Sequence, residues 1–236
     1  MTIKAITFDL DDTLWNNIPV LIKAERDVIE WLLTHFPNIN DHHDISTTIN
    51  EFRDFKDQIK QANPALTHQV TNLRKVSLEQ FLINADYSEK ASEGANQAME
   101  VFLTARHQVD YFDYVEAVLA ELNQQYTLGV LTNGNVNIRR LSIGDYFDFA
   151  FCADELNTSK PDPVFFQAGI QAAKVLPEEI AHVGDHPEYD VIGAKEVGLK
   201  AIWFNPEQAS WDYHIKPDAV ISCISELPKA INSLLR

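Results

Sequence analysis

Short runs of continuous apolar residues are the feature that most constrains how this chain folds. Strands buried on both faces are apolar throughout, whereas strands with one solvated face alternate apolar and polar residues. Six such runs are typical of strands, at residues 3–8, 126–131, 147–152, 180–183, 200–204 and 219–222. Residues 165–175 and 189–197 have helical spacing and flanking turn residues. The pattern predicts an α/β fold with a doubly wound parallel sheet covered by helices.

The interval between the first two predicted strands is too long for one crossover helix. Its sequence is helical in period, and one apolar stripe is formed by Leu21, Ala24, Val28, Trp31 and Leu32. We therefore predict an inserted α-helical unit over residues 15–108. The α/β core is then formed by residues 1–14 and 109–236.

Composition and charge narrow the possible partners. The chain has 236 residues, 45% hydrophobic and 23% charged, with 19 Lys and Arg against 35 Asp and Glu, which gives a net charge of −16. This field repels nucleic acids and anionic lipid surfaces, so we expect neither as a partner. An anionic substrate would need a metal ion or a local positive group. Nothing in the sequence indicates the oligomeric state.

Targeting signals are missing from the sequence as given. Asp9 interrupts the first apolar run too early for a signal peptide, and no stretch approaches the roughly 20 apolar residues of a spanning helix. Cys152 and Cys223 form no disulfide framework or metal-binding pair. We expect a soluble protein in the reducing cytoplasm.

Three carboxylates crowd into four residues where the first predicted strand ends, in the segment ITFDLDDTL at 6–14. Two like charges about 4 Å apart repel by roughly 4 kcal/mol at an effective dielectric near 20, so solvent, a cation or a proton must offset the repulsion. Side chains alternate along a strand, so Asp9 and Asp11 point the same way and Asp12 points away. By itself the segment also fits a solvated acidic loop whose Asp12 or Thr13 caps a helix.

Polar side chains also follow two other predicted strands. The second strand runs into LTNGN at 131–135, and the fourth runs into HVGD at 182–185, with Asp190 five residues later. Between them, Lys160 lies in the proline-containing segment SKPDP at 159–163. Each segment alone is explained by a turn, a cap or a surface lysine. Together they place polar groups from three strands at one edge of the sheet, where ligands bind in open α/β folds.

This ordered set resembles the haloacid dehalogenase superfamily, whose members are mostly phosphatases. The four motifs of that family resemble, in order, the run at 9–13, the segment 132–134, Lys160 and the segment 184–190. The insertion at 15–108 sits where the family places a helical cap. The resemblance covers essentially the whole chain and implies a Rossmann-like core with that cap.

The resemblance and the needs of phosphoryl transfer together imply roles for the motif residues. The reaction needs a nucleophile, a proton donor for the leaving oxygen and positive charge around the phosphoryl group. We expect Asp9 to be the nucleophile, forming an aspartyl-phosphate, and Asp11 to be the general acid and base. Thr132, Asn133 and Lys160 are expected to bind the phosphate.

We expect Mg²⁺ as the cofactor, because the motifs offer hard oxygen ligands. The expected ligands are Asp9, Asp185 and the main-chain carbonyl of Asp11. Asp190 is expected to orient Lys160 or a metal-bound water. The DHHD cluster at 41–44 more plainly fits a helix cap than a metal site, because adjacent histidines point in different directions.

The predicted function is a Mg²⁺-dependent phosphatase for a small phosphate monoester. Sequences flanking the motifs are similar to bacterial members of the family that act in flavin metabolism, and these flanks lie at 7–20, 131–135, 144–147 and 203–207. This similarity implies a substrate such as FMN, the phosphoribitylamino-pyrimidine intermediate of riboflavin synthesis, or a related ribityl or sugar phosphate. Trp15 and three arginines of the insertion, Arg53, Arg74 and Arg106, are either substrate contacts or packing residues and surface charges.

Two alternatives stay open. In a 2-haloacid dehalogenase the same Asp9 would attack carbon, but the dehalogenases of the superfamily lack an acid at the position of Asp11. A receiver-type phospho-signalling module also groups acids, a threonine, a lysine and Mg²⁺ on such a sheet. That module leaves Asp11 and the insertion unexplained.

Overall fold

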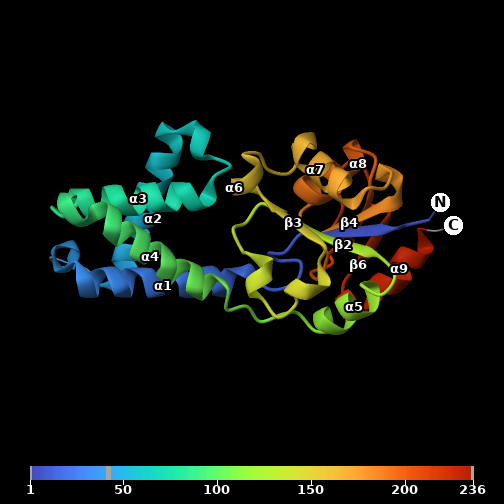
Figure 1. Ribbon diagram of the computed structural model, residues 1–236, viewed down its shortest axis with the longest axis horizontal. Helices are drawn as coiled ribbons and strands as arrows, with labels where there is room; N and C mark the ends of the chain where they lie inside the picture. Colours follow the sequence, from blue (N-terminus) through green and yellow to red (C-terminus); the bar gives the residue numbers. More distant parts are fainter. Residues whose placement is uncertain (1, 41–43, 235–236) are drawn as a thin grey trace. The chain divides into compact units, whose positions relative to one another are not determined.

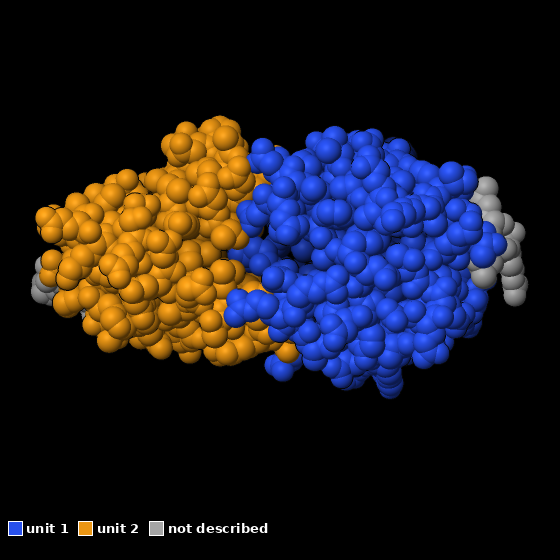
Figure 2. Space-filling view, viewed as in Figure 1, with its two compact units in different colours: residues 1–16, 110–236 blue, residues 17–109 orange. Residues whose placement is uncertain are grey.

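The computed structural model describes residues 2–40 and 44–234. The chain divides into two compact units, one of residues 1–16 and 110–236 and the other of residues 17–109 (Figure 2). Three residues of the DHHD cluster lie outside the described part of the chain. Its fourth, Asp44, caps a helix by accepting a hydrogen bond from the Thr47 N–H at 2.8 Å.

The first unit is built on a parallel sheet whose strands lie in the order β3-β2-β1-β4-β5-β6. The strands are β1 (Ala5–Phe8), β2 (Thr127–Thr132), β3 (Phe149–Cys152), β4 (Ile180–Gly184), β5 (Lys200–Phe204) and β6 (Ala219–Ile221). The chain moves outward from β1 to β3 and then crosses back to β4, so the topological switch point lies between β1 and β4. The parallel sheet predicted from the apolar runs is confirmed.

Helices cover both faces of this sheet. In Figure 1, α5 (Val115–Leu122) and α9 (Leu227–Ser233) lie on one face, whereas α7 (Pro163–Ala173) and α8 (Gly193–Glu196) lie on the other. Phe165 and Phe166 of α7 are fully buried in one apolar cluster with residues of β1, β2, β4 and β5. The core is thus doubly wound, as the strand pattern predicts.

Two predicted helices have different limits in the structure. The helix expected at 165–175 begins earlier, because Asp162 accepts a hydrogen bond from the Val164 N–H, and it ends earlier because Lys174 is left-handed. The helix expected at 189–197 is instead a π-helix, η7 (Pro187–Ile192), followed by the short α8. In so short a segment, the sequence periodicity of a π-helix cannot be distinguished from that of an α-helix.

The second unit is a bundle of four helices, α1 (Asn17–His35), α2 (Ile45–Ala62), α3 (Val70–Asn84) and α4 (Ala91–Arg106). The stripe predicted on the first helix is buried at Ala24, Val28 and Leu32, which pack in one cluster with residues of α3 and α4. The helical period of apolar residues in α1 is therefore explained by packing within the second unit.

Short helices make up most of the remaining regular structure. They are η1 (Pro37–Asn40), η2 (Pro64–Leu66), η3 (Ser88–Lys90), η4 (Ile138–Arg140), η5 (Gly144–Tyr146), α6 (Ala153–Leu156), η6 (Pro177–Glu179) and η8 (Ile224–Glu226). Within residues 2–40 and 44–234, no helix combines the length and apolar character needed to cross a membrane.

Candidate active site

The predicted site residues gather at the carboxyl ends of β1, β2 and β4. Asp9 follows β1 directly, and its N–H donates to the Val183 carbonyl of β4 at 2.9 Å. Thr132 is the last residue of β2, and Asp185 follows β4. Because β1 pairs with both β2 and β4, these three strand ends are neighbours. The sheet itself brings distant parts of the sequence together.

Lys160 is the positive centre of this group. Its Nζ donates to Asp9 Oδ1 at 2.7 Å and to Asp190 Oδ1 at 2.6 Å, and the side chains of Lys160 and Asp190 are each 2% exposed. Burial opposes its charge, but Asp190 and Asp9 raise the pKa of Lys160 above its usual value. Lys160 is therefore a fixed cation that joins Asp9, the candidate nucleophile, to the carboxylate of Asp190.

Asn133 positions the Lys160 segment. Its amide oxygen accepts from the Lys160 N–H at 2.8 Å, and its amide nitrogen donates to the Lys160 carbonyl at 3.0 Å. Both the oxygen and the nitrogen of the Asn133 amide are thus hydrogen-bonded to the backbone of Lys160. The sequence-based prediction that Asn133 binds phosphate stays a prediction. Thr132 is better placed for that role, because its Oγ1 accepts from the Gly134 N–H at 3.0 Å and keeps a hydroxyl hydrogen to donate.

Three carboxylates surround this single ammonium. Oxygens of Asp9, Asp185 and Asp190 all lie within 4.8 Å of one another. Burial raises the pKa of Asp9 well above its usual value, with Asp190 and Asp185 adding to the rise and Lys160 opposing it. Burial likewise raises the pKa of Asp185 to about 7, helped by repulsion from Asp190 and Asp12. The cluster carries two more negative charges than positive ones when its acids are ionised.

A divalent cation fits this donor set. The two excess negative charges would be balanced by the two positive charges of Mg²⁺, and carboxylate oxygens are ligands that this ion prefers. Asp9 and Asp185 are the acids that would hold it, with the Asp11 carbonyl as predicted from the sequence. Asp190 is already engaged, because it accepts hydrogen bonds from Lys160, from His182 at 3.1 Å and from the His186 N–H at 2.9 Å.

The carboxylate of Asp11 is held by an indole, a pairing that the sequence did not predict. Trp15 is fully buried, and its Nε1 donates to Asp11 Oδ1 at 3.0 Å. The Asp12 N–H donates to the Trp15 carbonyl at 2.8 Å, and Asp12 is left-handed with φ 60°. This tight turn after Asp11 carries Thr13, whose hydroxyl donates to Asp185 Oδ1 at 3.2 Å. The segment that bears Asp11, the predicted general acid, thus also orients a proposed metal ligand.

Gly184 is needed because of how closely Asp190 approaches it. A Cβ at position 184 would lie 2.2–2.5 Å from the side-chain atoms of Asp190, which no packing adjustment of a fully buried carboxylate can relieve. The glycine of the fourth motif therefore makes room for the acid that anchors Lys160.

His182 is a buried member of the site that sequence reasoning missed. Its Nε2 lies 3.1 Å from Asp190 Oδ1, and its Nδ1 lies 2.9 Å from Thr7 Oγ1, its register partner across β1 and β4. An ionised Asp190 only accepts, so the Nε2 must carry the hydrogen, and the Thr7 hydroxyl donates to Nδ1. Burial lowers the pKa of His182, which keeps the ring neutral. A connected series of contacts therefore runs from Thr7 through His182, Asp190 and Lys160 to Asp9.

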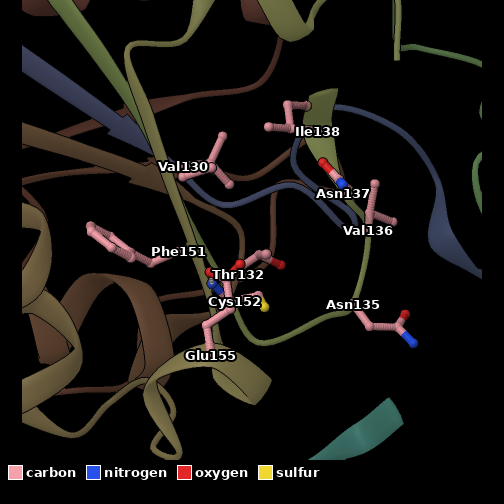
Figure 3. Close-up of a pocket in the computed structure, with 10 residues that line it drawn as sticks. Val130, Thr132, Asn135, Val136, Asn137, Ile138, Phe151, Cys152 and Glu155 are labelled. Carbon is pink, nitrogen blue, oxygen red and sulfur yellow. Dashed lines mark hydrogen bonds between the residues drawn. The ribbon is translucent and has the colours of Figure 1, made fainter. Parts of the chain in front are cut away.

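A small pocket lies beside Thr132, between β2, β3 and the loop after β2. Figure 3 shows Asn135, Val136 and Asn137 on that loop, and Cys152 lies next to Thr132, its register partner. The pocket has a volume of about 130 Å³. Pockets that enclose drug-sized ligands measure about 300–1,000 Å³, so this one does not accommodate a flavin ring system. Burial raises the pKa of the Cys152 thiol to about 11, so it is not a nucleophile at neutral pH.

His182→Leu should weaken catalysis by releasing Asp190 and, through it, Lys160. We expect turnover of an aryl phosphate to fall by roughly 10–100-fold, the usual effect of removing a group that orients a reacting residue. His182→Gln keeps an N–H donor for Asp190 and should recover most of that loss. Steady-state kinetics of the two variants, with Thr7→Ser as a matched conservative control, check this. Equal losses in the Leu and Gln variants would contradict the positioning role.

Asp185→Asn should stabilise the protein in the presence of a chelator, and more at pH 8 than at pH 5. A carboxyl whose folded pKa is raised to about 7 is favourable when protonated, so stability falls as pH rises from the unfolded value toward and through 7. The amide removes that penalty. Thermal melting at both pH values measures it, with exposed Asp212→Asn as control. Added Mg²⁺ should raise the melting temperature of the wild type but not of Asp185→Asn, and an unchanged pH dependence in Asp185→Asn would argue against the assignment.

Comparison with known proteins agrees with this geometry. The model of the haloacid dehalogenase-like hydrolases matches residues 3–198. The 5-amino-6-(5-phospho-D-ribitylamino)uracil phosphatase of Escherichia coli K12 is 32% identical over 97% of this chain and 96% of its own length. A glyceraldehyde 3-phosphate phosphatase of Pyrococcus furiosus is 30% identical over 99% of this chain and 94% of its own length.

Solved structures give the same family. A Pseudomonas syringae protein whose crystal structure is described as a 2-haloacid dehalogenase has a TM-score of 0.92 and 39% identity, covering 98% of this chain and 99% of that one. The family predicted from the order of the four motifs is thereby confirmed. The chain belongs to the haloacid dehalogenase-like hydrolases.

Proposed function

We propose that this protein hydrolyses small phosphate monoesters with Asp9 as the nucleophile and Mg²⁺ as the cofactor. One observation carries the proposal: a buried ammonium, Lys160, joins Asp9 to Asp190 inside a cluster of acids that exceeds it by two charges. A phosphoryl group needs a nucleophile and concentrated positive charge at one point. The two relatives described above are named as phosphatases, which supports the same activity here.

The first half-reaction transfers the phosphoryl group to Asp9. Lys160 bonds to Asp9 Oδ1, so the proposed attacking atom is Oδ2. A bond forms between Oδ2 and phosphorus while the bond from phosphorus to the ester oxygen breaks. Asp11, held by Trp15, gives its proton to that leaving oxygen. The alcohol departs, and the phosphoryl group stays on Asp9 as an acyl phosphate.

The second half-reaction returns Asp9 to its carboxylate form. Asp11, now ionised, takes a proton from a water molecule whose oxygen attacks phosphorus. The bond between phosphorus and Asp9 breaks, and inorganic phosphate leaves. Lys160 and Thr132 stabilise the phosphoryl oxygens in both steps. A Mg²⁺ ion held by Asp9, Asp185 and the Asp11 carbonyl would supply further charge neutralisation.

For the substrate, we propose a phosphorylated ribityl compound such as FMN or 5-amino-6-(5-phosphoribitylamino)uracil. The motif flanks at 7–20, 131–135, 144–147 and 203–207 support this class. So does the printed activity of the Escherichia coli relative, which spans nearly the whole chain.

A 2-haloacid dehalogenase is the second candidate, because a structure 39% identical to this chain carries that description. Asp11 separates the two reactions chemically. Halide leaves as a stable anion and needs no proton, whereas an alkoxide leaving group does. An acid fixed by an indole at this position is useful only for the ester. The family match removes the receiver module as an explanation of the sheet.

Asp9→Asn should abolish turnover of p-nitrophenyl phosphate with Mg²⁺, because the amide is not a nucleophile. Asp11→Asn should lose roughly 10²–10⁴-fold with an alkyl phosphate and less with p-nitrophenyl phosphate, whose leaving group needs little protonation. Steady-state rates on identically purified proteins measure both, with Asp212→Asn as a surface control. Near-wild-type activity of Asp9→Asn would refute the nucleophile assignment. Equal losses of Asp11→Asn on both esters would refute its role as the acid.

A screen of phosphate esters with Mg²⁺ tests the substrate class. We expect FMN and the phosphoribitylamino-pyrimidine to show higher kcat/KM than simple sugar phosphates, and we expect no halide release from 2-chloropropionate. Flavin-type esters that rank below sugar phosphates would reject the substrate proposal alone. Halide release without phosphate release would reject the phosphatase.

A further inference from the structure

The motif flank at 203–207 has no part in the steps of the proposed reaction, although its first residue contacts the site. Trp203 belongs to β5, is the register partner of Gly184 in β4, and is 5% exposed. Its indole Nε1 donates a hydrogen bond to the main-chain carbonyl of Asp185 at 2.7 Å. A buried indole N–H generally finds an acceptor, so the bond by itself is expected. The choice of acceptor is informative, because Asp185 is an acid that would hold Mg²⁺.

The peptide unit between Asp185 and His186 is held at both of its polar groups. Trp203 donates to its carbonyl oxygen, and its N–H donates to Asp190 Oδ2 at 2.9 Å. Asp190 is in turn fixed by the Lys160 ammonium at 2.6 Å. Rotation of this peptide plane would distort both hydrogen bonds, which weaken steeply with misalignment. The backbone conformation at Asp185 is therefore set by β5 on one side and by η7 on the other.

The carboxylate of Asp185 has a support of its own. The hydroxyl of the fully buried Thr13 donates to Asp185 Oδ1 at 3.2 Å. Backbone conformation limits which side-chain rotamers are allowed, so the held peptide and the Thr13 bond together restrict where the carboxylate points. Mg²⁺ demands nearly ideal octahedral geometry, which makes the direction of each ligand important for affinity. A ligand that is ordered before the ion binds loses less conformational freedom on binding.

The Trp203 ring is supported by the segment that follows β5. The rings of Trp203 and Trp211 make an edge contact, with centroids 4.9 Å apart and planes at 65°. Trp211 Nε1 donates to the Ile215 carbonyl at 3.0 Å. The turn between the two tryptophans is closed by Asn205, whose amide bonds to the N–H and the carbonyl of Ala209 at 2.9 and 3.0 Å. Two residues of the flank, Trp203 and Asn205, thus help to hold the indole in place.

We propose that Trp203 is a positioning residue of the metal site: its indole N–H fixes the peptide after Asp185 and so orients the Asp185 carboxylate for Mg²⁺ before the ion binds. The inference rests on the proposed function for one point, that Asp185 is a ligand of Mg²⁺. A purely structural Trp203 would contribute to the free energy of unfolding and leave the affinity for Mg²⁺ unchanged. A positioning Trp203 contributes to that affinity as well.

Thermal melting of the full chain over a series of Mg²⁺ concentrations, without substrate, measures both quantities. The melting temperature in EDTA gives the structural contribution, and its rise with Mg²⁺ gives the dissociation constant, because a ligand of the folded state stabilises that state. Trp203→Phe keeps a buried aromatic ring and removes the N–H. We expect its dissociation constant for Mg²⁺ to be roughly tenfold higher than that of the wild type, the lower end of the effect of losing a group that orients a metal ligand.

Trp211→Phe is the matched control, because it makes the same change in the neighbouring ring and removes an indole bond to Ile215 instead of Asp185. Its melting temperature in EDTA should fall, and its dissociation constant should equal that of the wild type. Asp185→Asn gives the effect of Mg²⁺ on a chain without this ligand. Replacement of Trp203 by benzothienylalanine keeps the bicyclic shape and puts sulfur in place of the N–H. It serves if Trp203→Phe does not fold, and it should weaken Mg²⁺ binding to a similar extent.

An unchanged dissociation constant in Trp203→Phe, or in the benzothienylalanine protein if the first does not fold, would overturn the positioning role and leave the proposed function intact. An equal rise in Trp211→Phe would also overturn it, since loosening of the aromatic contact would then explain the loss. If Mg²⁺ stabilises the wild type no more than Asp185→Asn, the role of Asp185 as a ligand fails, and the positioning role fails with it.

Discussion

The contact on which the site depends is the shared hydrogen bonding of the Lys160 ammonium to Asp9 and Asp190. Removing three charged groups from water is costly, and the cost is recovered only when donors and acceptors are fully matched at short distance. Here the two bonds are 2.6 and 2.7 Å, and Asp190 takes further donors from His182 and the His186 backbone. One cation thereby ties together the end of β1, the segment before α7 and the π-helix η7. The rest of the catalytic geometry is supported by this junction.

The same junction explains why the cluster favours a divalent cation and a phosphate. Lys160 neutralises one of three acids, and the pKa of Asp185 is raised to about 7 by burial and by its acidic neighbours. A protein does not gather excess buried charge at a sheet edge unless something balances it, and the switch point between β1 and β4 is where open α/β sheets bind ligands. The proposed cation and a phosphoryl group would balance each other's charge there. The protein as a whole stays strongly acidic, so the positive charge for an anionic substrate has to be local.

The backbone-level features were accessible from the sequence, because they follow from period and composition. Continuous apolar runs predicted the strands, and the motif order placed Asp9, Thr132, Lys160 and Asp185 on the strand ends and loops where the structure has them.

The sequence did not show which side chains are hydrogen-bonded to one another. The bond from Trp15 to Asp11, the pairing of Asn133 with the Lys160 backbone and the link from His182 to Thr7 depend on register between strands and on turn geometry. His182 stands inside an apolar strand, where a histidine carries no periodic signal. The π-helix was not predicted for a related reason, because its start is set by the His186 ring, which accepts hydrogen bonds from two backbone N–H groups.

The reaction class and the substrate's identity depend on different residues, so the residues that bind the phosphoryl group do not identify the rest of the substrate. In the proposed mechanism, the phosphoryl group and its bridging oxygen are contacted by Asp9, Asp11, Thr132 and Lys160, and every phosphate monoester shares these atoms. Their geometry therefore argues for hydrolysis of the ester and is silent on the alcohol. The pocket beside Thr132 measures about 130 Å³, too little for a flavin, so recognition of a large leaving group has to use other surfaces.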